Sequence, residues 1–183
     1  MPRTVVIDTC CTLNLLATRR EVAIVRSLVM QLLDTPQVSR EPMTLWTPPD
    51  HDGIRTKEPA STGSLRQSGH LRTQPLDTEA LVDAFVDAAA RIKDADASCI
   101  AVAGVLRLPL LTDDRKERRL ARQLFPAIEL VSTLDLIEEA ARTLAWTREE
   151  LVRIASDLRW RGNFAPPKGD PRGAWYESLL TGT

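Results

Sequence analysis

Four acidic positions that are far apart in the sequence each stand where a short apolar run stops. They are Asp8, Glu41, Asp96 and the pair Asp113–Asp114. In an open α/β sheet, the carboxyl ends of neighbouring parallel strands line one crevice, so side chains from distant parts of the sequence meet there. Carboxylates crowded into one crevice repel one another unless a divalent cation lies among them. The pattern therefore predicts a parallel α/β sheet with a magnesium or manganese site at its carboxyl edge.

Short apolar strands alternate with helical patterns along the chain. The β-branched run from Thr4 to Ile7 is typical of a buried parallel strand, and similar strands are expected from Pro109 to Thr112 and from Ile128 to Val131. Apolar residues at helical spacing predict helices over residues 13–16, 22–33, 77–93, 97–106 and 115–124, with two more beginning at 132 and 147. This alternation predicts a parallel sheet covered by helices on both faces, a three-layer α/β/α fold.

Two further segments carry weaker patterns. Gln37 to Ser39 is expected to be a short strand, after which Ser39 caps a short helix that carries Glu41. From Thr47 to Pro75 the composition changes to Pro, Gly, Ser, Thr and charged residues. We expect residues 47–75 to be a long polar insertion that contributes little to the core, because its sparse apolar side chains bury too little area to offset the entropy of ordering.

Length and composition limit the domain organisation. A chain of 183 residues, 43% hydrophobic and 27% charged, is ordinary for one globular domain with a small appendage. We assign residues 1–145 to the α/β domain and residues 146–183 to a C-terminal helix and tail. Aromatic residues gather in this tail, where they are expected to pack onto the domain or a partner, or to stack on nucleic-acid bases. They are Trp146, Trp160, Phe164, Trp175 and Tyr176.

The cysteines and the N-terminus indicate the cellular setting. Cys10, Cys11 and Cys99 are odd in number and lack zinc-ligand spacing, which argues against a disulfide framework and fits a reducing cytoplasm. The N-terminus runs directly into the first strand without a signal peptide, and no apolar stretch is long enough to cross a membrane. We expect a soluble cytoplasmic protein without a membrane partner. His51 and His70 lack cysteine companions and are expected to face solvent instead of binding zinc.

Each acidic position also has a simpler structural explanation. Asp114 followed by Glu117 fits a capping box, Asp96 stands just before an expected helix, and Glu41 alone is an ordinary surface carboxylate. Asp8 is harder to explain in this way, because burying an unpaired charge at the mouth of a sheet costs several kcal/mol. The sequence by itself leaves helix caps and a metal site as open alternatives.

Several of these segments resemble PIN-domain nucleases. Val5-Val6-Ile7-Asp8 followed by Asn14 resembles the opening strand and helix of that family. Asp96-Ala97-Ser98-Cys99-Ile100-Ala101 resembles its third acidic position with the small-residue helix that follows. Leu110-Leu111-Thr112-Asp113-Asp114 resembles the fourth, and Glu41 stands where the family keeps its second acid. The likeness to VapC-type toxins implies a PIN-like fold and a metal-dependent endoribonuclease, with Asp8, Glu41, Asp96 and Asp114 as its catalytic acids.

The resemblance and the chemistry together give each residue an expected role. Asp8, Asp96 and Asp114 are the expected Mg²⁺ or Mn²⁺ ligands, with Glu41 a ligand directly or through water. Asp113 is ambiguous, because adjacent residues in an extended segment point to opposite sides. Asn14 and Thr112 are expected to orient ligands or substrate, although a polar helix position explains Asn14 equally well. A basic run beside the acids is expected to bind RNA phosphates, with a merely solvated helix face as the alternative. It contains Arg115, Lys116, Arg118, Arg119 and Arg122.

The expected partners are RNA and, if the chain is a toxin, an antitoxin protein that presents Arg or Lys to the carboxylates. A homodimer is a further expectation. The main alternative is a catalytically inactive PIN-like module that binds RNA or protein and uses the acids as caps. A phosphatase of the haloacid dehalogenase type also has an Asp after its first strand, but Cys10 occupies the place of the second Asp that such enzymes need.

Overall fold

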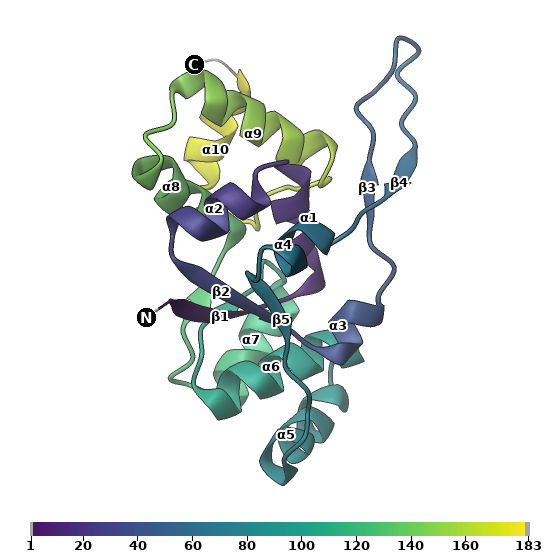
Figure 1. The fold of residues 1–183 in the computed structure, drawn as a ribbon, viewed down its shortest axis with the longest axis vertical. Coiled ribbons are helices and arrows are strands. Elements are labelled where there is room, and N and C mark those ends of the chain that lie inside the picture. The colour runs from purple at the N-terminus through teal and green to yellow at the C-terminus, as the bar shows by residue number, and fades with distance from the viewer. Residues whose placement is uncertain (1, 182–183) are drawn as a thin grey trace.

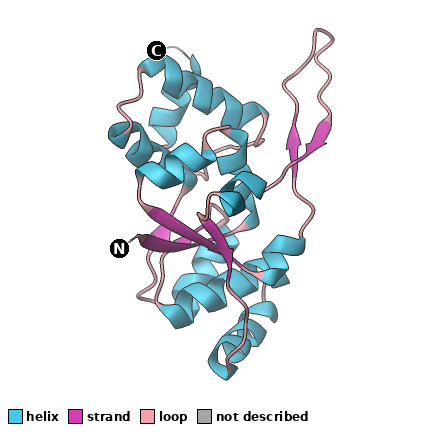
Figure 2. Ribbon diagram, in the orientation of Figure 1, coloured by secondary structure: helices cyan, strands magenta, loops and turns pink. Residues whose placement is uncertain are grey.

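A parallel sheet of five strands forms the centre of the computed structural model, which describes residues 2–181 (Figures 1 and 2). The strands are β1 (Arg3–Ile7), β2 (Met30–Asp34), β5 (Leu71–Thr73), β6 (Leu110–Leu111) and β7 (Leu130–Val131). Their order is β5-β2-β1-β6-β7, and every neighbouring pair is parallel. The predicted α/β class with a parallel sheet is confirmed. The carboxyl ends of β1, β2 and β6 therefore lie at one edge of the sheet.

Helices cover both faces of the sheet (Figure 2). Because side chains alternate along a strand, Val5 and Ile7 of β1 enter one core while Val6 enters the other. The first core is built with α1 (Thr9–Ala17), α2 (Glu21–Ser27), α4 (Gly63–Gln67), α8 (Thr133–Thr143), α9 (Arg148–Trp160) and α10 (Gly173–Thr181). The second is built with α3 (Pro36–Arg40), α5 (Glu79–Ala89), α6 (Asp94–Leu106) and α7 (Arg115–Leu124). Within residues 2–181, no helix is both long and apolar enough to cross a membrane.

The segment after α1 differs from the sequence prediction. The expected helix over residues 22–33 is wrong in its second half, since α2 ends at Ser27 and the chain continues into β2. Val29 has a left-handed φ of 50°, which no helix continues through. Leu32 is fully buried where β2 pairs with β1 and β5. This segment is a strand because it pairs on both sides, with β1 and β5, and such pairing cannot be seen in a single sequence.

The segment around Glu41 is also corrected. The expected strand over residues 37–39 is instead the short helix α3. Thr35 caps it by accepting a hydrogen bond from the backbone N–H of Val38 (3.2 Å), and Pro36 occupies the first helical position, where its missing N–H costs nothing. Glu41 thus follows the C-terminal end of a helix and does not lie in a helix capped by Ser39.

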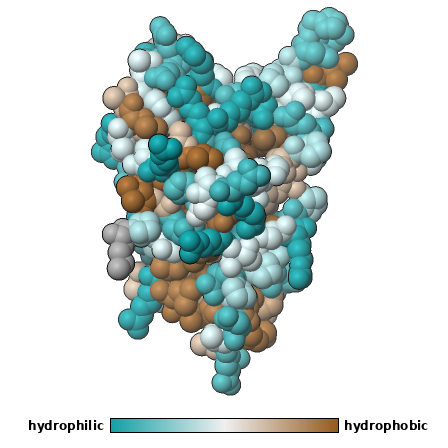
Figure 3. Space-filling model, in the orientation of Figure 1, coloured by the Kyte–Doolittle hydropathy of each residue, from teal (hydrophilic) through white to brown (hydrophobic). Residues whose placement is uncertain are grey.

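Residues 47–75 contain regular structure. A two-stranded hairpin of β3 (Thr44–Trp46) and β4 (Lys57–Pro59) projects from the body of the protein, and its surface is mostly hydrophilic (Figures 1 and 3). Its tip, residues 48–54, is exposed. Leu65 in α4 and Leu71 in β5 are buried in the first core. The prediction that residues 47–75 add little to the core is therefore wrong for its second half.

Helix caps follow the sequence closely. Thr147 and Glu150 form the predicted capping box of α9, and Ser132 begins α8 in the same way. Asp96 lies in the first turn of α6 and not before it, because that helix already begins at Asp94. At the C-terminal end, Leu158 and Tyr176 are buried in the same core as Val5.

Candidate metal centre

Asp8 lies at the carboxyl end of the central strand. Its side chain is 2% exposed and caps α1, with Oδ1 accepting a hydrogen bond from the backbone N–H of Cys11 (2.6 Å). Burial raises the pKa of this carboxyl to about 6, and the charge of Asp113 adds to the rise. Hydrogen bonds from Cys11 and Thr112 oppose it. Asp8 is thus a helix cap and, at the same time, a buried acid held at the sheet edge.

Glu117 is a site residue that sequence reasoning missed. It lies in the first turn of α7, its side chain is fully buried, and its Oε2 accepts a hydrogen bond from the hydroxyl of Thr112 (2.7 Å). Its other oxygen, Oε1, receives no donor from the described residues while both acids are ionised. A side-chain hydrogen bond with Asp8, which forms when one of the two carboxyls is protonated, is among the causes that raise the pKa of Glu117. Burial, followed by the charge of Asp8, raises the pKa of Glu117 well above its usual range. The Asp114-to-Glu117 spacing pointed to a capping box, but only Asp114 caps, so the Glu side chain is free to enter the crevice.

Three more carboxylates lie near one another at the carboxyl edge of the sheet. Burial raises the pKa of Asp96, and the charges of Asp114 and then Glu41 raise it further. Asp114 caps α7 by accepting a hydrogen bond from the backbone N–H of Glu117 (2.8 Å). Glu41 accepts a short hydrogen bond from the hydroxyl of Thr9. The structure therefore brings the end of α3, the start of α6 and the β6–α7 junction together with Asp8.

The exposed Cys10 lies near this group of acids. The pKa of its thiol is raised to about 12 by desolvation, and the next causes are four nearby carboxylates. They are Asp8, Asp96, Glu117 and Asp114. Because charge interactions of this kind weaken with distance, the thiol lies within reach of all four.

Asp113 belongs to a different part of the network. Its Oδ1 accepts from the backbone N–H of Thr133 (2.9 Å), and its Oδ2 accepts from Thr133 Oγ1 (2.5 Å), Asn14 Nδ2 (3.1 Å) and Cys11 Sγ (3.3 Å). Both oxygens are satisfied by protein donors that join α1 to α8. Asn14 therefore orients Asp113 and makes no hydrogen bond with Asp8, Asp96 or Asp114 in the described part of the chain.

Thr112 connects two of the acids. Its hydroxyl donates to Glu117 Oε2 and accepts from the backbone N–H of Asp114 (3.1 Å). It is fully buried between β6 and α7. One side chain thus fixes both the carboxylate of Glu117 and the turn that carries Asp114.

The sheet-edge carboxylates are spaced openly. Within residues 2–181, the only three His, Cys or acidic side chains whose ligand atoms all lie within 4.8 Å of one another are Asp50, His51 and Asp52. These three are exposed at the hairpin tip, and Asp50 Oδ1 already accepts from the backbone N–H groups of Asp52 (2.9 Å) and Ile54 (2.8 Å), as in an ordinary turn. A cation at the sheet edge would contact some carboxylates through water, which Mg²⁺ accepts readily. The burial of Asp8 and Glu117 and the raised pKa values of Asp8, Asp96 and Glu117 fit such a cation.

The basic run lies on α7, directly after the acids. The charge of Lys116 lowers the pKa of Asp96, which places this ammonium close to the crevice. Arg118 donates to the carbonyl oxygens of Thr112 (2.7 Å) and Val131 (3.1 Å) and so fixes the ends of β6 and β7. Arg115 and Arg119 are exposed on the same helix. Acidic and basic groups are thus juxtaposed at the carboxyl edge of the sheet.

Comparison of the chain with protein-family models, with curated proteins and with solved structures gives no match in any of the three.

Proposed function

We propose that the protein is a divalent-metal-dependent endoribonuclease with a PIN-like α/β/α fold. One observation carries the proposal: five carboxylates from four parts of the chain lie near one another at the carboxyl edge of a parallel sheet, and two of them, Asp8 and Glu117, are buried beside each other. The five are Asp8, Glu41, Asp96, Asp114 and Glu117. Helix capping explains the positions of Asp8 and Asp114, but it gives no reason to bury Glu117 beside Asp8.

Each residue has its own role in the proposed site. Asp8, Asp96, Asp114 and Glu117 would hold Mg²⁺ or Mn²⁺, with Glu41 at the rim of the crevice. A bound ion supplies charge neutralisation at the phosphodiester and lowers the pKa of a water molecule. Asp113 is left out of this set, because protein donors already occupy both its oxygens.

A second candidate is an inactive module of the same fold that binds RNA or protein. Asp8 and Asp114 both accept the backbone hydrogen bond of a helix N-terminus, which is the role that this alternative gives them. The burial of Glu117 beside Asp8, which helix capping does not explain, favours the nuclease.

Cleavage of labelled single-stranded and structured RNAs, with Mn²⁺ or with EDTA, tests the proposal. We expect cleavage only with metal. Glu117→Gln should lower the cleavage rate roughly 100-fold or more, because losing a metal ligand costs at least as much activity as losing a residue that only supports a ligand. Asp83→Asn, an exposed acid on α5, is the matched control and should cleave like the wild type. No metal-dependent cleavage by the wild type, or full activity in Glu117→Gln, would contradict the proposal.

A further inference from the structure

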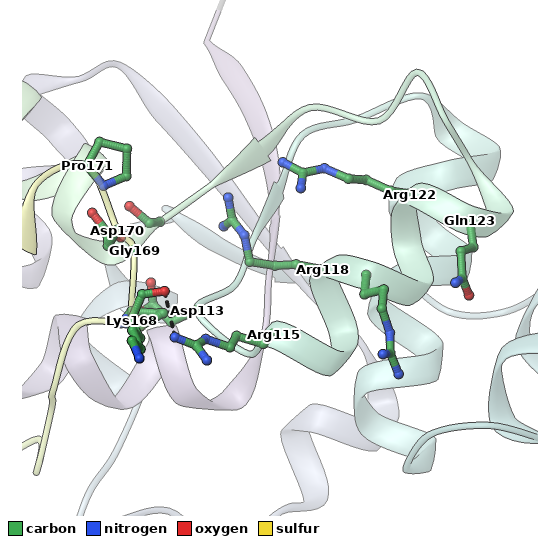
Figure 4. Close-up of a pocket in the computed structure, with 12 residues that line it drawn as sticks. Asp113, Arg115, Arg118, Arg122, Gln123, Lys168, Gly169, Asp170 and Pro171 are labelled. Carbon is green, nitrogen blue, oxygen red and sulfur yellow. Dashed lines mark hydrogen bonds between the residues drawn. The ribbon is translucent and has the colours of Figure 1, made fainter.

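A basic pocket lies beside the β6–α7 turn that carries Asp113 and Asp114. Its volume is about 620 Å³, and it lies between α7 and the segment Pro167–Pro171, which connects α9 to α10 (Figure 4). Five cationic side chains and two acidic ones line it. The cationic residues are Arg115, Arg118, Arg119, Arg122 and Lys168. The side chains of Arg115, Arg118 and Arg122 extend from α7 toward the opposite wall (Figure 4).

The arginines of this pocket keep their charge available. In the described part of the chain, none of the four makes an ion pair, whereas Arg66, Arg161 and Arg172 elsewhere each bind a carboxylate. Arg115 and Arg118 donate to backbone carbonyl oxygens only, Arg115 to that of Lys168 (2.6 Å). These bonds fix the side chains without neutralising them, and such prepositioned guanidinium groups suit a phosphate.

The two acids of the pocket are already engaged by protein donors. Asp113 accepts from Thr133 and Asn14, and Asp170 Oδ1 accepts from the backbone N–H of Arg172 (2.8 Å). Neither forms an ion pair with a pocket cation among the described residues. The pocket therefore carries an excess of positive charge.

We infer that this pocket binds a backbone phosphate of the same RNA strand that enters the acidic crevice, at a position beside the scissile one. The inference rests on the proposed function, and the contiguity of the two sites supports it: Asp113 lines the pocket and Asp114, the next residue, faces Asp96 in the crevice. A strand carrying one phosphate per nucleotide fits an acidic, metal-binding crevice followed by a cationic pocket. No aromatic ring is among the described residues that line the pocket, so it holds phosphate without reading bases.

RNA binding measured without cleavage tests this inference. The probe is a fluorescein-labelled single-stranded RNA dodecamer in EDTA, and its anisotropy is followed at several salt concentrations. Arg122→Gln/Lys168→Gln removes two pocket cations, of which Arg122 makes no hydrogen bond or ion pair with the described residues. We expect Kd to rise on the order of tenfold and the slope of log K against log salt to shrink by about 1.4, since each phosphate contact to a single strand contributes about 0.7.

Arg142→Gln, which removes an exposed cation from α8, is the matched control and should keep the slope of the wild type. An unchanged slope in the double variant, or no RNA binding by the wild type, would overturn the inference. So would displacement of the RNA by polyglutamate as effectively, per charge, as by unlabelled RNA. Salt-dependent binding that needs Arg122 and Lys168, without any cleavage in Mn²⁺, would refute the nuclease and leave the pocket intact.

Discussion

Two buried carboxylates in contact, Asp8 and Glu117, are the least expected feature of this molecule at the scale of single residues. Burial raises the pKa of each, and the charge of Asp8 raises that of Glu117 further. Capping alone does not require this pair, because Asn or Ser would cap α1 as well as Asp8 does and Glu117 caps no helix. A divalent cation is the compensation that the proposed function supplies.

The raised pKa of Asp8 gives a pH dependence with a definite sign. Below pH 3.8, its ordinary value, the carboxyl is protonated in both the folded and unfolded states, so burial costs little. Between pH 3.8 and about 6 the unfolded chain ionises this carboxyl while the folded protein still holds its proton, so the free energy of unfolding falls by up to about 3 kcal/mol and levels off above pH 6.

We therefore expect Asp8→Asn, which retains the cap, to be more stable than the wild type at pH 7 in EDTA and equal to it near pH 4. Urea unfolding of both proteins across this range measures the difference. Two stability curves that stay parallel from pH 4 to pH 7 would show that Asp8 ionises freely in the folded protein.

Thr112 offers a test of positioning at the same scale. Its hydroxyl holds Glu117 and the turn of Asp114, so Thr112→Val should weaken Mn²⁺ affinity by roughly 10- to 100-fold. Thr112→Ser keeps the hydroxyl and should retain most of that affinity. Equal affinity in both variants would mean that the acids need no such support.

At the scale of elements, α6 is fixed by close packing through its small residues. A Cβ on Gly104 would lie 2.2 Å from the ring of Phe125, although alanine is otherwise favoured over glycine in a helix by about 1 kcal/mol. We expect the clash to prevail, so that Gly104→Ala lowers the free energy of unfolding by about 1–3 kcal/mol. Gly104→Ala combined with Phe125→Ala should show a smaller penalty for the added methyl group than Gly104→Ala alone. Additive effects in this double-mutant cycle would refute the contact.

The elements that the sequence predicted well are those with local signals. The strand before Asp8, the helix after Asp114 and the capping box at Thr147 each depend on neighbouring residues. The strand β2 was missed because its apolar residues also fit a helix, and only pairing with β1 and β5 decides between them. The strand β5 was missed because it is short and follows a polar stretch, and sheet pairing buries only Leu71 well.

In the candidate site, too, the residues with local sequence signals were predicted and the residue placed by a tertiary contact was missed. Asp8, Glu41, Asp96 and Asp114 stood out because each follows or begins an element. Glu117 did not, because a glutamate at that spacing ordinarily turns back to cap its helix. Only the hydrogen bond from Thr112, a tertiary contact across the β6–α7 turn, shows that it points inward.

At the scale of the whole molecule, a net charge of −1 conceals a strong local separation of charge. Carboxylates gather at the sheet edge, while arginines that form no ion pair within residues 2–181 line the adjoining pocket. We expect RNA binding to weaken steeply with salt despite the acidic net charge, because local cations determine contact with phosphates. Binding in EDTA that is insensitive to salt would contradict this picture.

Calorimetric titration of Mn²⁺ into the metal-free protein tests the central claim most directly. Two sets of carboxylates compete as the site: the sheet-edge acids and the exposed trio of Asp50, His51 and Asp52. We predict that Asp8→Asn/Asp96→Asn abolishes Mn²⁺ binding, whereas Asp50→Asn/Asp52→Asn leaves the affinity within about twofold of the wild type, well below the 10- to 100-fold cost of losing a supporting group. Binding that survives the first pair of substitutions and disappears with the second would place the metal on the hairpin and contradict a catalytic centre at the sheet edge.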